Sequence, residues 1–193
     1  MKVLRFFLIL ILPSSFAFAQ ESYQVVPEES SLIIKGTSSL HDWESTVEDF
    51  SGSGIFFMNG SLVEGVENLG FSAVTESIKS GKRVMDKKTR GALDSKNYPQ
   101  IEFVFSSIAQ VGEDSLEVAG TLSLAGVTNE ITVAGAYQVG EDGSIIISGL
   151  VPINMEDYGV KPPTAMVGTL KTGKDVEVEY QMRFQLTNPS TNQ

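Results

Sequence analysis

Apolar and polar residues alternate with a period of two over most of the chain. The clearest example runs from Asp175 to Leu186, where every second residue is apolar and the residues between are polar. The apolar set of this segment is Val176, Val178, Tyr180, Met182, Phe184 and Leu186. Successive side chains of a strand point to opposite faces, so the pattern predicts a strand with one buried face and one solvated face. Strands buried on both faces show continuous apolar runs instead.

Eight or nine segments have this strand character, which predicts an all-β fold. Besides 176–186 they are 23–26, 32–36, 47–58, 69–78, 100–107, 115–124, 131–137 and 144–153. Turn residues separate them at 59–60, 112–114, 126–129 and 140–143. Such short links favour up-and-down neighbours over the crossed connections of an immunoglobulin sandwich. We therefore predict an antiparallel barrel, which also removes exposed strand edges.

Two segments depart from the alternation. Residues 84–93 have helical spacing, with Met85, Thr89 and Ala92 on one face, and Pro99 follows shortly after. We expect one short helix here, lying across a mouth of the barrel. Residues 154–172 contain two glycines and two prolines and predict a long ordered loop. Long loops in compact domains tend to be lids or binding loops.

The first residues have the layout of a secretory signal. Lys2 and Arg5 precede an apolar run at 6–12, and Ala17-Phe18-Ala19 supplies small residues at a cleavage site. The run is shorter than the ~20 residues that span a bilayer, so cleavage is favoured over an uncleaved anchor. We predict that 1–19 is a signal peptide and that 20–193 is one exported, periplasmic domain. No later stretch is apolar enough to cross a membrane, so stable membrane insertion is not expected.

Charge and composition narrow the partners. The chain has 193 residues, a net charge of −10 and no cysteine. An acidic domain is repelled by nucleic acid and by anionic lipid surfaces, so neither is expected as a general partner. The basic residues nevertheless cluster, since seven lie between Lys79 and Lys96, opposed there by Asp86 and Asp94. This basic segment is either a solvated face or a surface for an anionic head group.

Catalytic chemistry has little support in the sequence. His41 is the only histidine, and its closeness to Ser39 and Asp42 along the chain is not triad geometry. A zinc site needs three or four ligands, most of which would have to be carboxylates. No phosphate loop or dinucleotide fingerprint occurs. We predict no catalytic residue, metal or cofactor. The tripeptide His41-Asp42-Trp43 either is structural, with Trp43 filling one end of the core and His41 and Asp42 satisfying backbone groups at a strand start, or contacts a ligand.

Several motifs resemble those of the YceI family of polyisoprenoid-binding, lipocalin-like proteins. They are M-D-K-K-T-R-G-A-L at 85–93, Y-P-Q-I-E-F at 98–103, G-T-L-S-L-A-G-V-T at 120–128, Ile78 and D-Y-G-V at 157–160. The resemblance covers about 23–186. Residues 37–44, T-S-S-L-H-D-W-E, depart from the H-x-G-I/V-S form of many members, which leaves the ligand open.

The resemblance implies an extended, eight-stranded, lipocalin-like barrel that holds a long apolar molecule. A polyisoprenoid, an isoprenoid quinone or a fatty-acid derivative would fit, and family members often pair as homodimers. The residues expected to line the apolar pocket are Trp43, Phe71, Phe103, Phe105, Leu122, Val133, Ile147, Tyr180 and Phe184. The residues expected at the mouth, near a head group, are His41, Lys87, Lys88 and Arg90. Two alternatives are a hydrolase of lipid-like substrates that uses His41, and a ligand-free stress or interaction barrel filled by its own side chains.

Overall fold

A computed structural model describes residues 19–165 and 170–187. The predicted signal peptide lies outside these residues, apart from Ala19, which begins the first strand, and it stays a prediction. The strands are β1 (Ala19–Val25), β2 (Ser31–Ser38), β3 (Trp43–Val47), β4 (Phe50–Asn59), β5 (Leu62–Val74), β6 (Ile78–Lys79), β7 (Gln100–Val111), β8 (Ser115–Leu124), β9 (Val127–Val139), β10 (Ile145–Asn154), β11 (Thr164–Ala165) and β12 (Leu170–Leu186). The helices are α1 (Arg83–Ala92) and the 3-10 turns η1 (Pro27–Glu29), η2 (Thr75–Ser77) and η3 (Met155–Tyr158).

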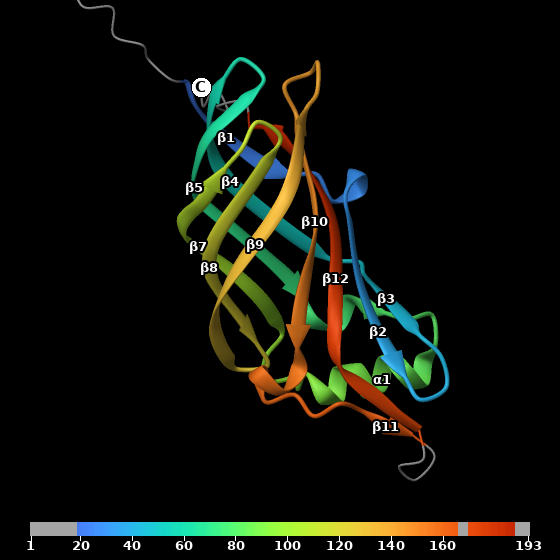
Figure 1. The fold of residues 1–193 in the computed structure, drawn as a ribbon. Coiled ribbons are helices and arrows are strands. Elements are labelled where there is room, and N and C mark those ends of the chain that lie inside the picture. Colours follow the sequence, from blue (N-terminus) through green and yellow to red (C-terminus); the bar gives the residue numbers. More distant parts are fainter. Residues whose placement is uncertain (1–18, 166–169, 188–193) are drawn as a thin grey trace, which may run out of the picture.

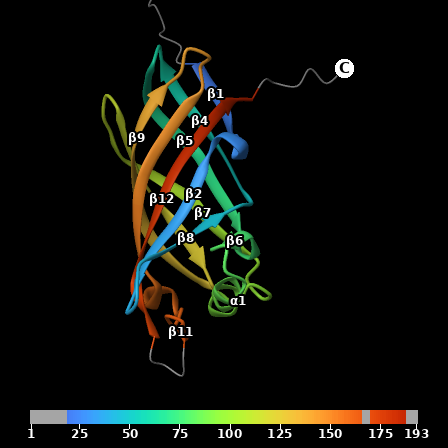
Figure 2. The ribbon, with the colours of Figure 1, turned by 90° about the vertical axis from the view of Figure 1, so that its right-hand side faces the viewer.

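Eight strands close into an antiparallel barrel. Their order is β1-β4-β5-β7-β8-β9-β10-β12, and β12 pairs back with β1. Strand β12 also pairs with β2 over Thr172–Gln181, so β2 continues the position of β1 beyond η1. In the same way β3 continues β4, and β6 continues β5. The predicted all-β barrel with one short helix is therefore confirmed, and the helix crosses one end of it (Figures 1 and 2).

The structure corrects three details of the prediction. The strand expected at 47–58 is broken, because β3 ends at Val47 and β4 begins at Phe50. The strand expected at 69–78 is likewise interrupted by η2. The turn expected at 126–129 is shifted to Ala125 and Gly126, whose φ angles are 50° and 83°. A two-residue hairpin turn of this kind requires positive φ at both central positions, and β9 starts directly afterwards.

The long loop at 154–172 contains structure of its own. It begins with η3, turns at Gly159 and then forms β11, which pairs with β12 through Thr164 and Lys171. Its side chains Met155, Tyr158 and Val160 are buried and pack against Leu93 and other apolar side chains. Residues 166–169 lie outside the described part. The described loop is therefore a packed wall at the helix end of the barrel.

The end of the barrel opposite α1 is filled by side chains. Phe56 packs against Tyr23 and Phe184, with ring centroids 5.3 and 5.4 Å apart. The Tyr137 hydroxyl donates to the carbonyl oxygen of Glu113 at 2.9 Å and accepts from the amide of Val63 at 3.1 Å. These contacts tie neighbouring hairpins together at what we call the packed end.

Candidate functional site

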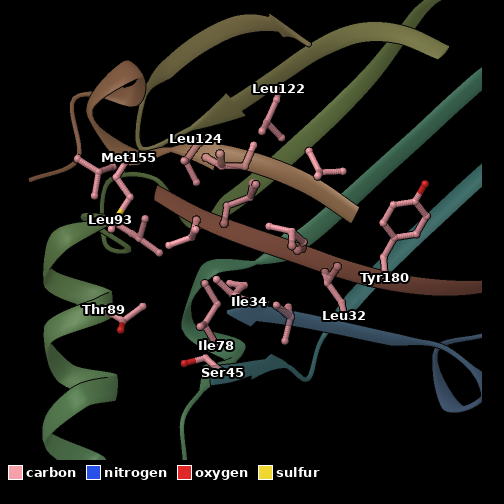
Figure 3. Close-up of a pocket in the computed structure, with 18 of the residues that line it drawn as sticks. Leu32, Ile34, Ser45, Ile78, Thr89, Leu93, Leu122, Leu124, Met155 and Tyr180 are labelled. Carbon is pink, nitrogen blue, oxygen red and sulfur yellow. The ribbon is translucent and has the colours of Figure 1, made fainter. Parts of the chain in front are cut away.

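A cavity of about 570 Å³ occupies the half of the barrel nearest α1. Its walls are mostly apolar and come from six of the eight barrel strands and from β2, β3 and β6. They include Leu32 and Ile34 of β2, Ile78 of β6 and Leu122 of β8 (Figure 3). Ligand pockets in proteins typically measure ~300–1,000 Å³ and have mainly apolar linings. The barrel is thus packed at one end and hollow at the other.

Helix α1 forms one wall of the cavity. The side chains of Met85, Thr89 and Ala92 line it, as the helical spacing of the sequence predicts. Figure 3 shows Thr89 and Leu93 pointing from the helix into the cavity, with Met155 beside Leu93. The opposite face of the helix carries charged side chains, which keeps the helix at the surface while its apolar face closes the barrel.

The predicted apolar set is largely brought together around this cavity. Eight of its nine members line the wall: Trp43, Phe71, Phe103, Leu122, Val133, Ile147, Tyr180 and Phe184. The ninth, Phe105, does not, because it lies one pleat further along β7 and packs, half-buried, against the core. That these side chains contact a ligand stays a prediction.

Trp43 combines the two roles that the sequence left open. Its indole N–H donates to the carbonyl oxygen of Thr37 at 3.0 Å, which anchors the ring at the start of β3. The ring covers its cross-strand neighbour Gly36 so closely that a Cβ there would overlap it. The same side chain lines the cavity. Trp43 is therefore a structural anchor whose ring forms part of the wall.

His41 lies at the edge of the cavity and is exposed. Its Nδ1 lies 2.8 Å from the main-chain oxygen of Asp42. The Ser39 hydroxyl instead accepts a hydrogen bond from the amide of Lys171 at 3.1 Å. These contacts do not assemble Ser39, His41 and Asp42 into a triad. Within residues 19–165 and 170–187, no group of three or more histidine, aspartate or glutamate side chains could hold a metal ion.

The basic residues divide into those that reach the cavity and those that do not. Lys88 lines it, and its Nζ donates to the main-chain oxygen of Thr164 at 2.5 Å. Lys87 and Arg90, which were expected at the mouth, are absent from the lining because they lie on other faces of α1. Lys82 and Lys171 do line the cavity.

From the sequence, Lys82 was expected only as part of the basic segment, and Lys171 was not expected at the mouth. Lys171 falls within the loop at 154–172, whose length is typical of lids and binding loops, but no motif singled it out there. It reaches the mouth because its main chain is hydrogen-bonded to Ser39 of the link between β2 and β3, a contact over 132 positions that local sequence does not reveal.

The inner wall is apolar with a few hydroxyl groups. Ser45 is buried, and its hydroxyl and that of Thr89 lie on facing walls of the cavity (Figure 3). The Tyr180 hydroxyl donates to the main-chain oxygen of Ala134 at 3.1 Å. Burial raises the pKa of Tyr180 from 10.0 to about 12, so its phenol is neutral at physiological pH. In the described lining the charged and basic side chains are His41, Lys82, Lys88 and Lys171, all of them on segments at the helix end.

We call the opening at this end the cavity mouth. It is bounded by the link between β2 and β3, the first turn of α1, and β11, which lie together at one end of the barrel in both ribbon views (Figures 1 and 2). Within the described residues, no helix is long and apolar enough to cross a membrane.

Comparisons with known proteins agree with this architecture. A family model for the YceI-like domain matches residues 23–184. A UPF0312 protein of Pseudomonas putida (strain W619) is 30% identical over 151 residues, which is 75% of this chain and 74% of that protein. The crystal structure of Burkholderia cenocepacia BcnA has a TM-score of 0.70 at 19% identity and covers 82% of this chain and 98% of its own.

A polyisoprenoid binding domain from Saccharophagus degradans, implicated in plant cell wall breakdown, has a TM-score of 0.67 at 17% identity. The match covers 86% of this chain and 99% of that domain. At these identities the two structures share the fold with this chain.

Proposed function

Because this chain belongs to the family of YceI-like domains, we propose that it binds one long apolar molecule inside its barrel. The ligand class is a polyisoprenoid, an isoprenoid quinone or a fatty-acid derivative. The observation that carries the proposal is the apolar cavity of about 570 Å³ between α1 and the packed end. The binding activity named for the Saccharophagus degradans domain supports it.

The size of the cavity limits the length of the buried chain. With roughly 30 Å³ for each methylene-sized unit, by analogy with water in the liquid, the cavity holds on the order of 20 such units. Each buried methylene contributes about 0.8 kcal/mol, so the gross gain is about 16 kcal/mol. Association and ordering cost roughly 4–15 kcal/mol, which leaves a favourable balance without an elaborate polar site.

A polar or anionic head group would lie at the cavity mouth. Lys82, Lys88 and Lys171 line the cavity from segments at that end, and charge-assisted hydrogen bonds to phosphate or carboxylate are strong. Of the basic residues expected from the sequence to meet a head group, the proposal keeps Lys88 together with His41. Lys87 and Arg90 are left out because they do not line the cavity.

The arrangement supports a binding protein rather than an enzyme. The hydrolase alternative needs a nucleophile beside His41, yet the neighbouring Ser39 hydroxyl is hydrogen-bonded to the amide of Lys171. The alternative of a filled, ligand-free barrel conflicts with the cavity, since a filled interior leaves no such space.

The direct test is extraction of the purified protein with organic solvent, followed by mass spectrometry of the extract. We expect one lipid per chain or, from a delipidated sample, saturable uptake of acyl or prenyl probes. Trp43 is the only tryptophan and lines the cavity, so its emission should change on uptake. A protein that yields no lipid and takes up no probe would refute the proposal.

A matched pair of variants tests whether the probe binds in the cavity. Val133 lines the cavity, whereas Val104 points outward from β7 and is 58% exposed. Val133→Phe should reduce probe affinity because it removes cavity volume, and Val104→Phe should leave affinity unchanged. Equal effects of both variants would mean that the probe binds elsewhere.

We further propose that the protein works in the periplasm after removal of 1–19. The mass of the exported protein checks this, because cleavage after Ala19 predicts a mature chain that starts at Gln20. A full-length mass in the exported fraction would contradict it. The homodimer expected from the family resemblance stays a prediction, which sedimentation of the mature chain tests.

A further inference from the structure

Two apolar side chains stand out at the cavity mouth. Val84 is 72% exposed and Leu40 is 66% exposed, more than any other large apolar side chain of the described residues. Val84 lies in the first turn of α1, and Leu40 lies in the link between β2 and β3. Both also line the cavity, so they form part of its rim. Exposed apolar side chains that border a cavity opening suggest contact with an apolar or amphipathic surface.

Basic side chains surround this rim. Lys82 and Arg83 adjoin Val84 along the chain, while Lys88 and Lys171 also line the cavity. In the described part of the chain the ion pairs involve Lys35, Lys174 and Arg183, and none involves a basic residue of α1 or its flanks. The positive charge at the mouth is therefore not neutralised by salt bridges to neighbouring carboxylates there.

The acidic residue of α1, Asp86, forms hydrogen bonds with Ser80 rather than salt bridges with the lysines at the mouth. The Asp86 carboxylate accepts hydrogen bonds from the Ser80 hydroxyl at 2.6 Å and from the Ser80 amide at 2.8 Å. These bonds hold the carboxylate against the segment before the helix. The whole chain has a net charge of −10, whereas the mouth is lined by three lysines, with the exposed Asp42 as an acidic neighbour on the link between β2 and β3.

We propose that the cavity mouth docks reversibly on an anionic lipid bilayer. Leu40 and Val84 enter the boundary between head groups and acyl chains, and the surrounding lysines contact lipid phosphates. Two inserted side chains give weak anchoring, and the acidic remainder of the surface is repelled by the same membrane. The repulsion orients the molecule mouth-first and keeps it from stable insertion.

Docking in this orientation has a consequence for the ligand. A long apolar molecule could move between bilayer and cavity without crossing water, because the rim that enters the membrane also borders the cavity. This consequence rests on the proposed function, whereas docking itself rests on the exposed rim and its charge.

The test is co-sedimentation of the mature protein with vesicles of phosphatidylcholine alone or with added phosphatidylglycerol. We expect binding to the anionic vesicles that weakens as salt is raised, because screening reduces the attraction. Leu40→Ser and Val84→Ser should each lower the vesicle affinity about fivefold or more. Leu150→Ser and Val104→Ser are the matched controls, since these side chains are 51% and 58% exposed on the barrel wall. The controls should bind like the unaltered protein.

A second pair of variants tests whether the positive charge at the mouth contributes to vesicle binding. Lys82→Gln should lower affinity for anionic vesicles about fivefold, whereas Lys35→Gln should not, because Lys35 lies on β2 and pairs with Glu179. Equal binding to both vesicle types, or equal loss in rim and control variants, would overturn the proposal. So would a dimer that Leu40→Ser dissociates while vesicle binding persists, because the rim would then face a second copy.

Probe uptake from solution separates docking from the proposed function. Arg83→Gln, at an exposed residue that does not line the cavity, should retain uptake while it weakens binding to anionic vesicles. A protein that docks yet takes up no probe retains this inference and contradicts the ligand proposal. A protein that takes up probe and ignores anionic vesicles contradicts the docking and retains the ligand proposal.

Discussion

The Lys88 ammonium group donates a hydrogen bond to the main-chain oxygen of Thr164, with 2.5 Å between Nζ and oxygen. The two residues are 76 positions apart in the sequence. Their contact joins α1 to β11 at the cavity mouth. It is therefore one of the polar links at the mouth, beside the hydrogen bond between the Lys171 amide and the Ser39 hydroxyl.

Replacing this link should speed ligand exchange. In Lys88→Met the hydrogen bond is lost while much of the side-chain volume remains, so we expect a bound acyl probe to dissociate about three- to tenfold faster. Stopped-flow transfer of the probe to excess vesicles measures the rate. Lys87→Met is the control, because Lys87 is exposed and does not line the cavity. Identical rates in both variants would show that the link does not restrain the mouth.

Gly36 should be intolerant of a side chain. Gly36→Ala places a methyl group into the Trp43 ring and forces that ring to move, which we expect to lower the free energy of unfolding by about 1–3 kcal/mol. Gly70→Ala is the matched control, since no atom lies within 4 Å of a Cβ at that position. Urea unfolding measures both. A destabilised Gly70→Ala with a stable Gly36→Ala would contradict the packing described for Trp43.

The two halves of the barrel should respond differently to loss of side-chain volume. Ile145 is fully buried in the core, so Ile145→Ala leaves a new cavity and should cost about 2–5 kcal/mol. Ile131 already borders the open cavity, so Ile131→Ala should cost clearly less. Urea unfolding of delipidated protein gives the comparison. Equal losses would indicate that the helix end is packed in solution.

The raised pKa of Tyr180 should cause a loss of folding stability at alkaline pH. Its pKa is raised by burial to about 12, so the folded state favours the neutral phenol. This contribution is complete below pH 10, the ordinary value, and is lost as pH rises from 10 toward 12, because the unfolded chain ionises first. Tyr180→Phe lacks the phenol and should lose less stability over this range in urea unfolding.

Tyr98→Phe controls for the loss of a surface hydroxyl group, because the Tyr98 side chain is exposed. Tyr23 and Tyr158, whose pKa values burial also raises, are present in both variants. Tyr98→Phe should follow the unaltered protein between pH 10 and 12. An unchanged pH dependence in Tyr180→Phe would mean that the Tyr180 hydroxyl is more accessible to water than the structure indicates.

The sequence by itself determined most of the strands, the helix and the sidedness of both, but not the break between β3 and β4 or the interruption by η2. Alternation along 176–186 predicts which side chains of β12 face inward, because a pleated strand has no other way to separate apolar from polar residues. The helical phase of Met85 and Thr89 likewise predicts the face that α1 turns to the barrel. These inferences depend on local geometry alone.

The tertiary structure alone decided which inward side chains border a cavity. Phe103 and Phe105 share one face of β7, yet Phe103 lines the cavity and Phe105 packs into the core. Periodicity reports the direction of a side chain and not what lies across the barrel from it. Lys171 shows the same limit at the mouth, since hydrogen bonds between its main chain and Ser39, 132 positions away, bring it there. The volume between facing walls depends on how all eight strands close, and no single segment of the chain encodes it.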